Sequence, residues 1–110
     1  MLEQSPELTK LLSILDDNQA IDIVTINVSE QTAVTDFMVI SSGRSSRHVK
    51  AIAMNVVEKM KQANMPILGS HGLESGDWAL IDFGDFVLHV MQPDTRAFYN
   101  LEGLWQDNQQ

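Results

Sequence analysis

Two apolar segments on either side of Gly84-Asp85 constrain the fold more than any other feature of the sequence. Residues 78–83 and 86–91 are both strand-like in composition. Gly-Asp closes two-residue β-hairpins because glycine readily adopts a positive φ. The sequence therefore predicts a strand, a tight turn and a second strand.

The predicted hairpin has two unlike faces, because successive side chains of a strand alternate between faces. One face is typical of a protein core and pairs Phe83 with Phe86, Ile81 with Leu88, and Ala79 with Val90. The other face pairs Trp78 with Met91, Leu80 with His89, and Asp82 with Val87. This second face is too apolar to be left in water, so either a helix or another molecule covers it.

Length and composition indicate one domain over residues 1–110, with 106–110 as a polar tail. The chain has no cysteine, which excludes disulfides, a thiolate nucleophile and a zinc site with sulfur ligands. Its apolar runs are too short to span a membrane, and its first residues do not begin a signal peptide. We therefore expect a cytoplasmic protein with no membrane partner.

The formal net charge of -8 argues against nucleic acid as the primary partner, since that mode of binding needs clustered Lys and Arg. A basic partner is favoured instead. Five of the seven basic residues lie between positions 44 and 61. That segment is either a solvated helix face, which is the favoured interpretation, or a phosphate contact.

The other segments predict an α/β domain of two or three layers. We expect helices at 6–18, at 46–63 and from Pro93 onwards, neighbouring antiparallel strands at 21–28 and 36–41, and a short strand at 66–69. Ser5 is the expected cap of the first helix. One side of the last helix is expected to carry Ala97, Phe98, Leu101, Leu104 and Trp105.

Candidate catalytic groups are few. Asp85 is explained by the turn, whereas Asp82 lies on the apolar second face and is expected to bind Arg or Lys of a partner, or Arg96. His89 with Asp82 is conceivable as a general base, but a structural or interface histidine is favoured. His48 and His71 are expected to be solvated, and the histidines lack ligand spacing, so we predict no metal or other cofactor.

The Ser42-Gly43 turn before the long helix has two interpretations. Amides at a helix start bind anions, but this turn lacks the Lys of a P-loop and the glycine pattern of a dinucleotide site. Helix capping by Ser45 is favoured. Tyr99 and Trp105 are expected to be core anchors or interface residues.

The order of several short motifs resembles the ribosomal silencing factor family, the Iojap-like proteins of bacteria, mitochondria and chloroplasts. These motifs cover nearly the whole chain: Asp36-Phe37-Met38-Val39-Ile40, Ser42-Gly43, Ser46-Arg47-His48-Val49, Trp78 through Asp82-Phe83-Gly84-Asp85 to His89-Val90, and Arg96, Tyr99, Leu101-Glu102 and Leu104-Trp105. The resemblance implies a nucleotidyltransferase-like fold, with a mixed sheet flanked by helices but without the catalytic aspartate pair.

The resemblance also implies a function that is not enzymatic. Members of the family bind ribosomal protein L-fourteen on the large ribosomal subunit and block the small subunit by steric overlap, which represses translation when nutrients are short. Carried over by position, the expected partner-binding residues are Trp78, Asp82, His89, Met91, Arg96, Tyr99 and Glu102.

Two other hypotheses remain open. One is a small metal-dependent nucleotidyl- or phosphoryl-transfer enzyme that uses the Ser42-Gly43 turn with Asp77, Asp82 or Asp85. The other is a homodimer that pairs through the apolar second face, which is compatible with ribosome binding.

Overall fold

The computed structural model describes residues 6–33, 35–65 and 67–107, apart from the side chains of 105–107. Within these ranges the chain forms five strands and four helices, in the order α1 (Pro6–Asp17), β1 (Ile21–Asn27), β2 (Phe37–Ser42), α2 (Ser46–Gln62), β3 (Gly69–His71), β4 (Trp78–Asp82), β5 (Phe86–Met91), α3 (Pro93–Tyr99) and α4 (Leu101–Asp107).

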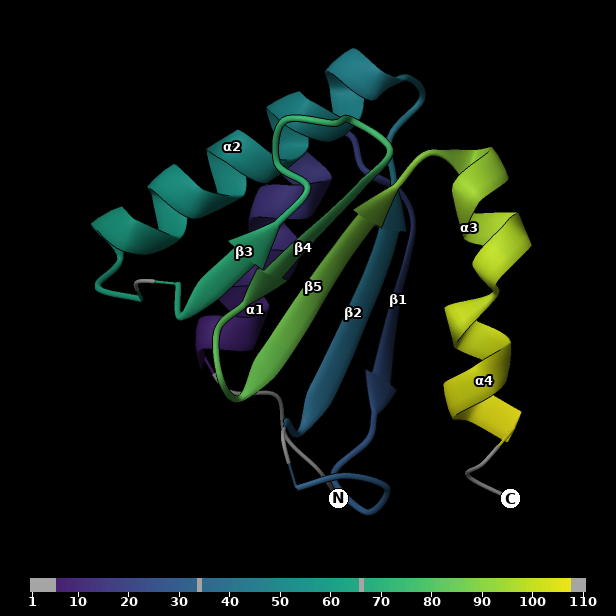
Figure 1. Ribbon diagram of the computed structural model, residues 1–110. Helices are drawn as coiled ribbons and strands as arrows, with labels where there is room; N and C mark the ends of the chain where they lie inside the picture. Colours follow the sequence, from purple (N-terminus) through teal and green to yellow (C-terminus); the bar gives the residue numbers. More distant parts are fainter. Residues whose placement is uncertain (1–5, 34, 66, 108–110) are drawn as a thin grey trace.

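The five strands form one mixed sheet in the order β1-β2-β5-β4-β3. Strand β2 runs parallel to β5, whereas the other neighbouring strands are antiparallel. Helices α1 and α2 lie together on one face of the sheet, and α3 and α4 stand beside β1 (Figure 1). The expected mixed sheet with flanking helices and the antiparallel pairing of β1 with β2 are both confirmed.

The β4–β5 hairpin has the predicted register. Trp78 lies opposite Met91, Leu80 opposite His89 and Asp82 opposite Val87. Gly84 has a φ of 92°, and the Phe83 amide donates to the Phe86 carbonyl at 3.0 Å, which closes the two-residue turn. The residues of the turn thus fix which side chains share a face.

The first sheet face carries the main core. Helix α1 contributes its stripe of Leu8, Leu11 and Leu15, all fully buried, and α2 contributes a second stripe at helical spacing. Opposite them lie the inward side chains of the sheet, which are Val39, Ala79, Ile81, Phe83, Phe86, Leu88 and Val90. Both predicted amphipathic helices are therefore confirmed.

The second sheet face is covered in part by the chain itself. A smaller apolar cluster forms there from Ile26, Val28, Met38, Ile40 and Met91, with Val24, Trp78 and Leu101 packed against it. Leu101 belongs to α4, so this helix shields the part of the face formed by β1 and β2. Towards β4, Leu80 and Val87 remain only partly buried.

The prediction of one continuous C-terminal helix is wrong. Asn100 adopts the left-handed conformation (φ 48°, ψ 55°), which ends α3 and lets α4 begin in a new direction. Its amide donates to the Arg96 carbonyl at 2.9 Å, and its Oδ1 accepts from the Gly103 amide at 3.2 Å. Asparagine suits both roles, because it tolerates this conformation and caps helix starts.

Three smaller predictions need comment. The short strand β3 begins at Gly69, three positions after the predicted start, because its ladder to β4 pairs Gly69 with Asp82. Pro66 and the Ser5 cap lie outside the described residues. Helix α4 continues to Asp107, so the helix includes the first residues of the predicted polar tail.

No helix in the described part of the chain combines the length and apolarity that a membrane crossing requires.

Replacement of Asn100 tests the helix break. We expect Asn100→Ala to lower the free energy of unfolding by about 1–2 kcal/mol, because alanine strains the left-handed conformation and removes the cap. Asn100→Gly keeps the left-handed conformation, so its free energy of unfolding should fall by only a few tenths of a kcal/mol, about 0.3 kcal/mol. Urea unfolding of both variants measures the difference; equal losses would contradict a left-handed Asn100.

Candidate functional site

Four ring side chains form a continuous row that runs from the sheet to α3. The ring centroids are 5.8 Å apart for His89 and Trp78, 4.8 Å for Trp78 and Tyr99, and 5.0 Å for Tyr99 and Phe98. Strand β5 supplies His89, β4 supplies Trp78, and α3 supplies the other two. We call these four residues the aromatic row.

The aromatic row passes from the interior to solvent. His89 is 5% exposed and Trp78 is partly buried, whereas Tyr99 and Phe98 are 52% and 80% exposed. Leu104 of α4 is also exposed, so the last two helices carry three of the five large apolar side chains that are exposed among the described residues. Such clustering of exposed apolar groups marks an interaction surface.

Sequence reasoning missed Phe98 and Leu104 as surface residues. They were expected on one side of a continuous helix together with Leu101, but Leu101 packs against the second apolar cluster while both of them are exposed. The one local signal was Asn100 itself, a residue type that ends helices in the left-handed conformation and caps new ones. The side chain of Trp105, expected on the same side, lies outside the described residues.

His89 holds the buried end of the row. The indole Nε1–H of Trp78 donates to His89 Nδ1 at 2.9 Å, so the ring proton of neutral His89 sits on Nε2. Nε2 is buried and has no hydrogen-bond partner in the described residues. Burial disfavours the charged imidazolium and lowers the pKa of His89 from 6.5 to about 4.

Arg96 is a structural group inside the chain. It is 9% exposed and donates to the carbonyls of Ile21 and Asp22, to Ser42 Oγ at 2.9 Å, and to Glu102, whose Oε2 lies 2.9 Å from Arg96 Nη2. Arg96 was expected to bind a partner, but its guanidinium binds groups of its own chain instead. Glu102, another expected contact, is the carboxylate among them.

Two further expected contact residues have internal roles. Met91 is fully buried in the second apolar cluster, because α4 and Trp78 cover it. Asp82 is partly exposed, and its Oδ1 accepts from the Gly84 amide at 2.8 Å, which stabilises the hairpin turn. Of the seven expected contacts, Trp78, Tyr99, Asp82 and Glu102 therefore keep accessible surface, whereas His89, Met91 and Arg96 are buried.

The residues of the Ser42-Gly43 turn are engaged in contacts within the chain. Ser42 is buried and accepts from Arg96, and a β-carbon at Gly43 would lie 2.8 Å from the Val49 amide nitrogen. Ser45 caps α2 as predicted, since its Oγ accepts from the His48 amide at 3.2 Å. The glycine thus brings β2 close to the start of α2, where a larger residue would not fit.

The remaining ionisable groups do not converge. The described residues contain no cluster of three or more His, Cys, Asp or Glu with metal-binding geometry. Asp77 accepts from Gln92 Nε2 at one end of β4, and Asp82 lies at the other end. His48 is not solvated as expected, because its Nδ1 accepts from the Arg44 amide and its Nε2 donates to the Asn18 carbonyl.

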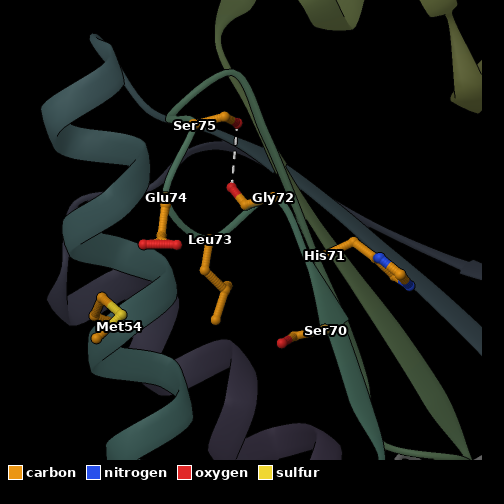
Figure 2. A pocket seen from close by; sticks show the side chains of 7 residues that line it. All are labelled: Met54, Ser70, His71, Gly72, Leu73, Glu74 and Ser75. Atoms are coloured by element: carbon orange, nitrogen blue, oxygen red, sulfur yellow. Dashed lines mark hydrogen bonds between the residues drawn. The ribbon is translucent and has the colours of Figure 1, made fainter.

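A cavity of about 560 Å³ lies on the other side of the molecule, between α2 and the β3–β4 loop. Figure 2 shows Leu73 and Met54 bordering the same space, while the ring of His71 points away from it. The lining is mixed: Met54, Ser70, His71, Gly72, Leu73, Glu74 and Ser75. The lining has no second carboxylate and no Lys or Arg, and the ring of His71 points away, so the cavity does not assemble a catalytic pair with Glu74.

The arrangement of these motifs matches one known family. A family model described as "Ribosomal silencing factor during starvation" matches residues 2–110. The chain belongs to the ribosomal silencing factor family. A family member from Chromobacterium violaceum is 43% identical over 100 residues, which cover 90% of this chain and 82% of that protein. One from Zymomonas mobilis is 44% identical over 91 residues, covering 83% and 68%.

Relatives and solved structures extend this result. A crystal structure of a Chromobacterium violaceum protein has a TM-score of 0.91 and 39% identity, over 96% of this chain and 88% of that one. The mouse protein "Mitochondrial assembly of ribosomal large subunit protein 1" is 37% identical over 102 residues, 90% of this chain and 45% of the mouse protein. This chain therefore shares its fold with the Chromobacterium violaceum protein.

Substitution of Arg96 tests its structural role in this family member. We expect Arg96→Lys to lower the free energy of unfolding by about 3 kcal/mol, because one ammonium cannot satisfy the acceptors that the guanidinium fork reaches. Arg44→Lys is the matched control, since Arg44 is exposed and its guanidinium donates to Gln19 at the surface. Chemical denaturation should separate the two variants; equal stabilities would contradict the role given to Arg96.

The lowered pKa of His89 predicts an acid-sensitive fold. Between pH 6.5 and about 4 the unfolded chain binds a proton at His89 but the folded chain does not, so stability falls as the pH falls through this window. At about 1.4 kcal/mol per pKa unit, the full loss is roughly 3 kcal/mol. His89→Leu should lack this component, and parallel stability curves of variant and wild type from pH 7 to 4 would contradict it.

Proposed function

We propose that this chain binds ribosomal protein L-fourteen on the large ribosomal subunit and blocks docking of the small subunit by steric overlap. Translation is thereby repressed when nutrients are limiting. The role is non-enzymatic, and the protein acts in the cytoplasm, where its target is. The observation that carries the proposal is the exposed part of the aromatic row, which adjoins an apolar sheet face in a member of the ribosomal silencing factor family.

The exposed side chains supply the kind of contact that dominates protein interfaces. Phe98, Tyr99 and Leu104 present apolar area to solvent, and Trp78 lies directly behind Tyr99. Aromatic residues bury much area and lose little conformational entropy, which makes them common interface hot spots. We propose Trp78, Phe98, Tyr99 and Leu104 as the apolar anchors of the interface.

Charge supplies the second argument. The chain carries a formal net charge of -8, and Asp82, Asp94 and Glu102 lie on the elements that carry or adjoin the row. Ribosomal proteins are basic as a class, so such a surface attracts them and accelerates association. Asp82 is expected to contact a Lys or Arg of the partner directly, whereas Glu102 already forms an ion pair with Arg96.

His89, Met91 and Arg96 support the interface from within. Their side chains are buried, and they contact residues that carry the exposed surface. A second copy of the chain is a further occupant of the same surface, which would then pair with itself until the ribosome competes. Mass measured against protein concentration, with and without large subunits, tests that competition.

Replacement of Phe98 tests the surface with little risk to the fold, because its side chain is 80% exposed. We expect Phe98→Ser to weaken binding to large subunits, and to purified ribosomal protein L-fourteen, by about tenfold. It should also restore joined ribosomes on a sucrose gradient.

Met54→Ser is the matched control. Met54 is exposed and apolar but lies on α2, beside the cavity on the other side of the molecule, so its loss should leave binding unchanged. Equal effects of the two substitutions would contradict the proposed surface. Metal-dependent nucleotide binding with no effect on subunit joining would favour the enzyme hypothesis instead.

A further inference from the structure

The hydrogen bond between Trp78 and His89 is the only polar contact in the aromatic row that the described residues provide. Indole has a single donor and no acceptor, so the position of one acceptor determines which way the ring faces. Here that acceptor is His89 Nδ1, 2.9 Å from Trp78 Nε1. On its other side, Trp78 contacts the next ring of the aromatic row, Tyr99, with ring centroids 4.8 Å apart.

Trp78 needs such an anchor because the sheet supports it on one side only. The ladder between β3 and β4 ends at the pair His71 and Leu80, so the β4 segment that holds Trp78 extends past β3. His89 in contrast lies on β5 between two strands, opposite Ile40 on β2 and Leu80 on β4. The hydrogen bond therefore fixes a side chain of the sheet margin to a side chain of the sheet centre.

Apart from this hydrogen bond, the polar ring of His89 destabilises the fold at its buried position. Its Nε2–H is buried without a partner in the described part of the chain, and an unpaired buried donor destabilises the folded state. An apolar residue in this position would avoid that cost. The acceptor that His89 offers to Trp78 is the one feature that a leucine of similar size cannot supply.

We propose that His89 is a positioning residue of the ribosome-binding surface: it holds the indole of Trp78, and through it the ring of Tyr99, in the orientation that meets the partner. Only the neutral ring with its proton on Nε2 can do this, because Nδ1 must accept. In the bound complex His89 itself makes no contact with the partner, since its side chain is 5% exposed.

The surrounding ionisable groups leave His89 neutral. On neighbouring β4, Asp82 is engaged by the Gly84 amide. On α3 and α4, Arg96 and Glu102 pair with each other, Asp94 is exposed, and the ring of Tyr99 contacts that of Trp78 at a tilt. Strand β2 presents Ile40, Met38 and Ser42 on this face, none of them charged. No ion pair of the described residues reaches His89.

A pair of substitutions separates the acceptor from the shape of the ring. We expect His89→Leu to unfold at the same or higher urea concentration as the wild type but to bind large subunits about tenfold more weakly. His89→Asn carries its acceptor oxygen on Cγ, where Nδ1 of the histidine lies, and should bind within about threefold of the wild type. The proposal would be overturned if His89→Leu bound large subunits as tightly as the wild type. It would also be overturned if binding weakened in both variants in proportion to their loss of stability.

An NMR measurement reads the hydrogen bond directly, without ribosomes. Long-range proton–nitrogen spectra should show the proton of His89 on Nε2 at pH 7, and the Trp78 indole proton should exchange more slowly than in His89→Leu. A proton on Nδ1, or equal exchange rates, would overturn the proposal. Because the role of His89 rests on the proposed function, a wild-type protein that fails to bind large subunits would overturn that function, whereas failure of the inference alone leaves wild-type binding intact.

Discussion

One buried guanidinium holds the last two helices against the sheet. Arg96 of α3 donates to two carbonyls of β1, to Ser42 at the end of β2 and to Glu102 of α4. A seven-residue helix is not stable alone in water, so α3 depends on this anchor and on its apolar contacts. The same bonds occupy carbonyls at the edge strand β1, where Asp22 adopts a φ of 51° beside a break in the ladder. Tyr99 lies one turn after Arg96 on α3. The bonds of Arg96 therefore determine where the exposed rings of this helix lie relative to the sheet.

The two faces of the sheet are covered to different extents, and the candidate site lies on the face that is covered less. The first face is sealed by α1 and α2 into a core. Within the described residues, Leu101 of α4 and the side chain of Trp78 cover part of the second face. Tyr99 of α3 packs against Trp78, and helices α3 and α4 expose Phe98, Tyr99 and Leu104. A cover that is itself apolar on the outside is typical of a surface completed by another molecule. Membership of the ribosomal silencing factor family and the acidic charge of the chain support the proposal of a basic ribosomal protein as that molecule.

Most of the fold and about half of the site follow from local patterns. The turn at Gly84-Asp85 fixed the register of β4 and β5, and the spacing of apolar residues identified α1 and α2. The pairing of Trp78 with Met91 was also predictable, but pairing does not reveal exposure. Met91 is buried because Leu101 of α4 and the Trp78 indole pack against its cluster, and the same indole lies against His89. Phe98 is 80% exposed, although it lies on the same helix as the buried Arg96. Each of these outcomes depends on contacts between residues far apart in the sequence.

By itself, the sequence determined the elements of this protein, its acidic charge, the apolar second face and the motifs of its family, because alternation, helical periodicity and turn chemistry act over a few residues. Only the tertiary structure decided which groups remain accessible to a partner. From the sequence, Arg96 could bind either a partner or its own chain. In the structure it binds its own chain, because the fold places it beside β1, β2 and Glu102. Burial is a property of the whole packing arrangement, since it depends on what lies above a side chain, and no local pattern contains that information.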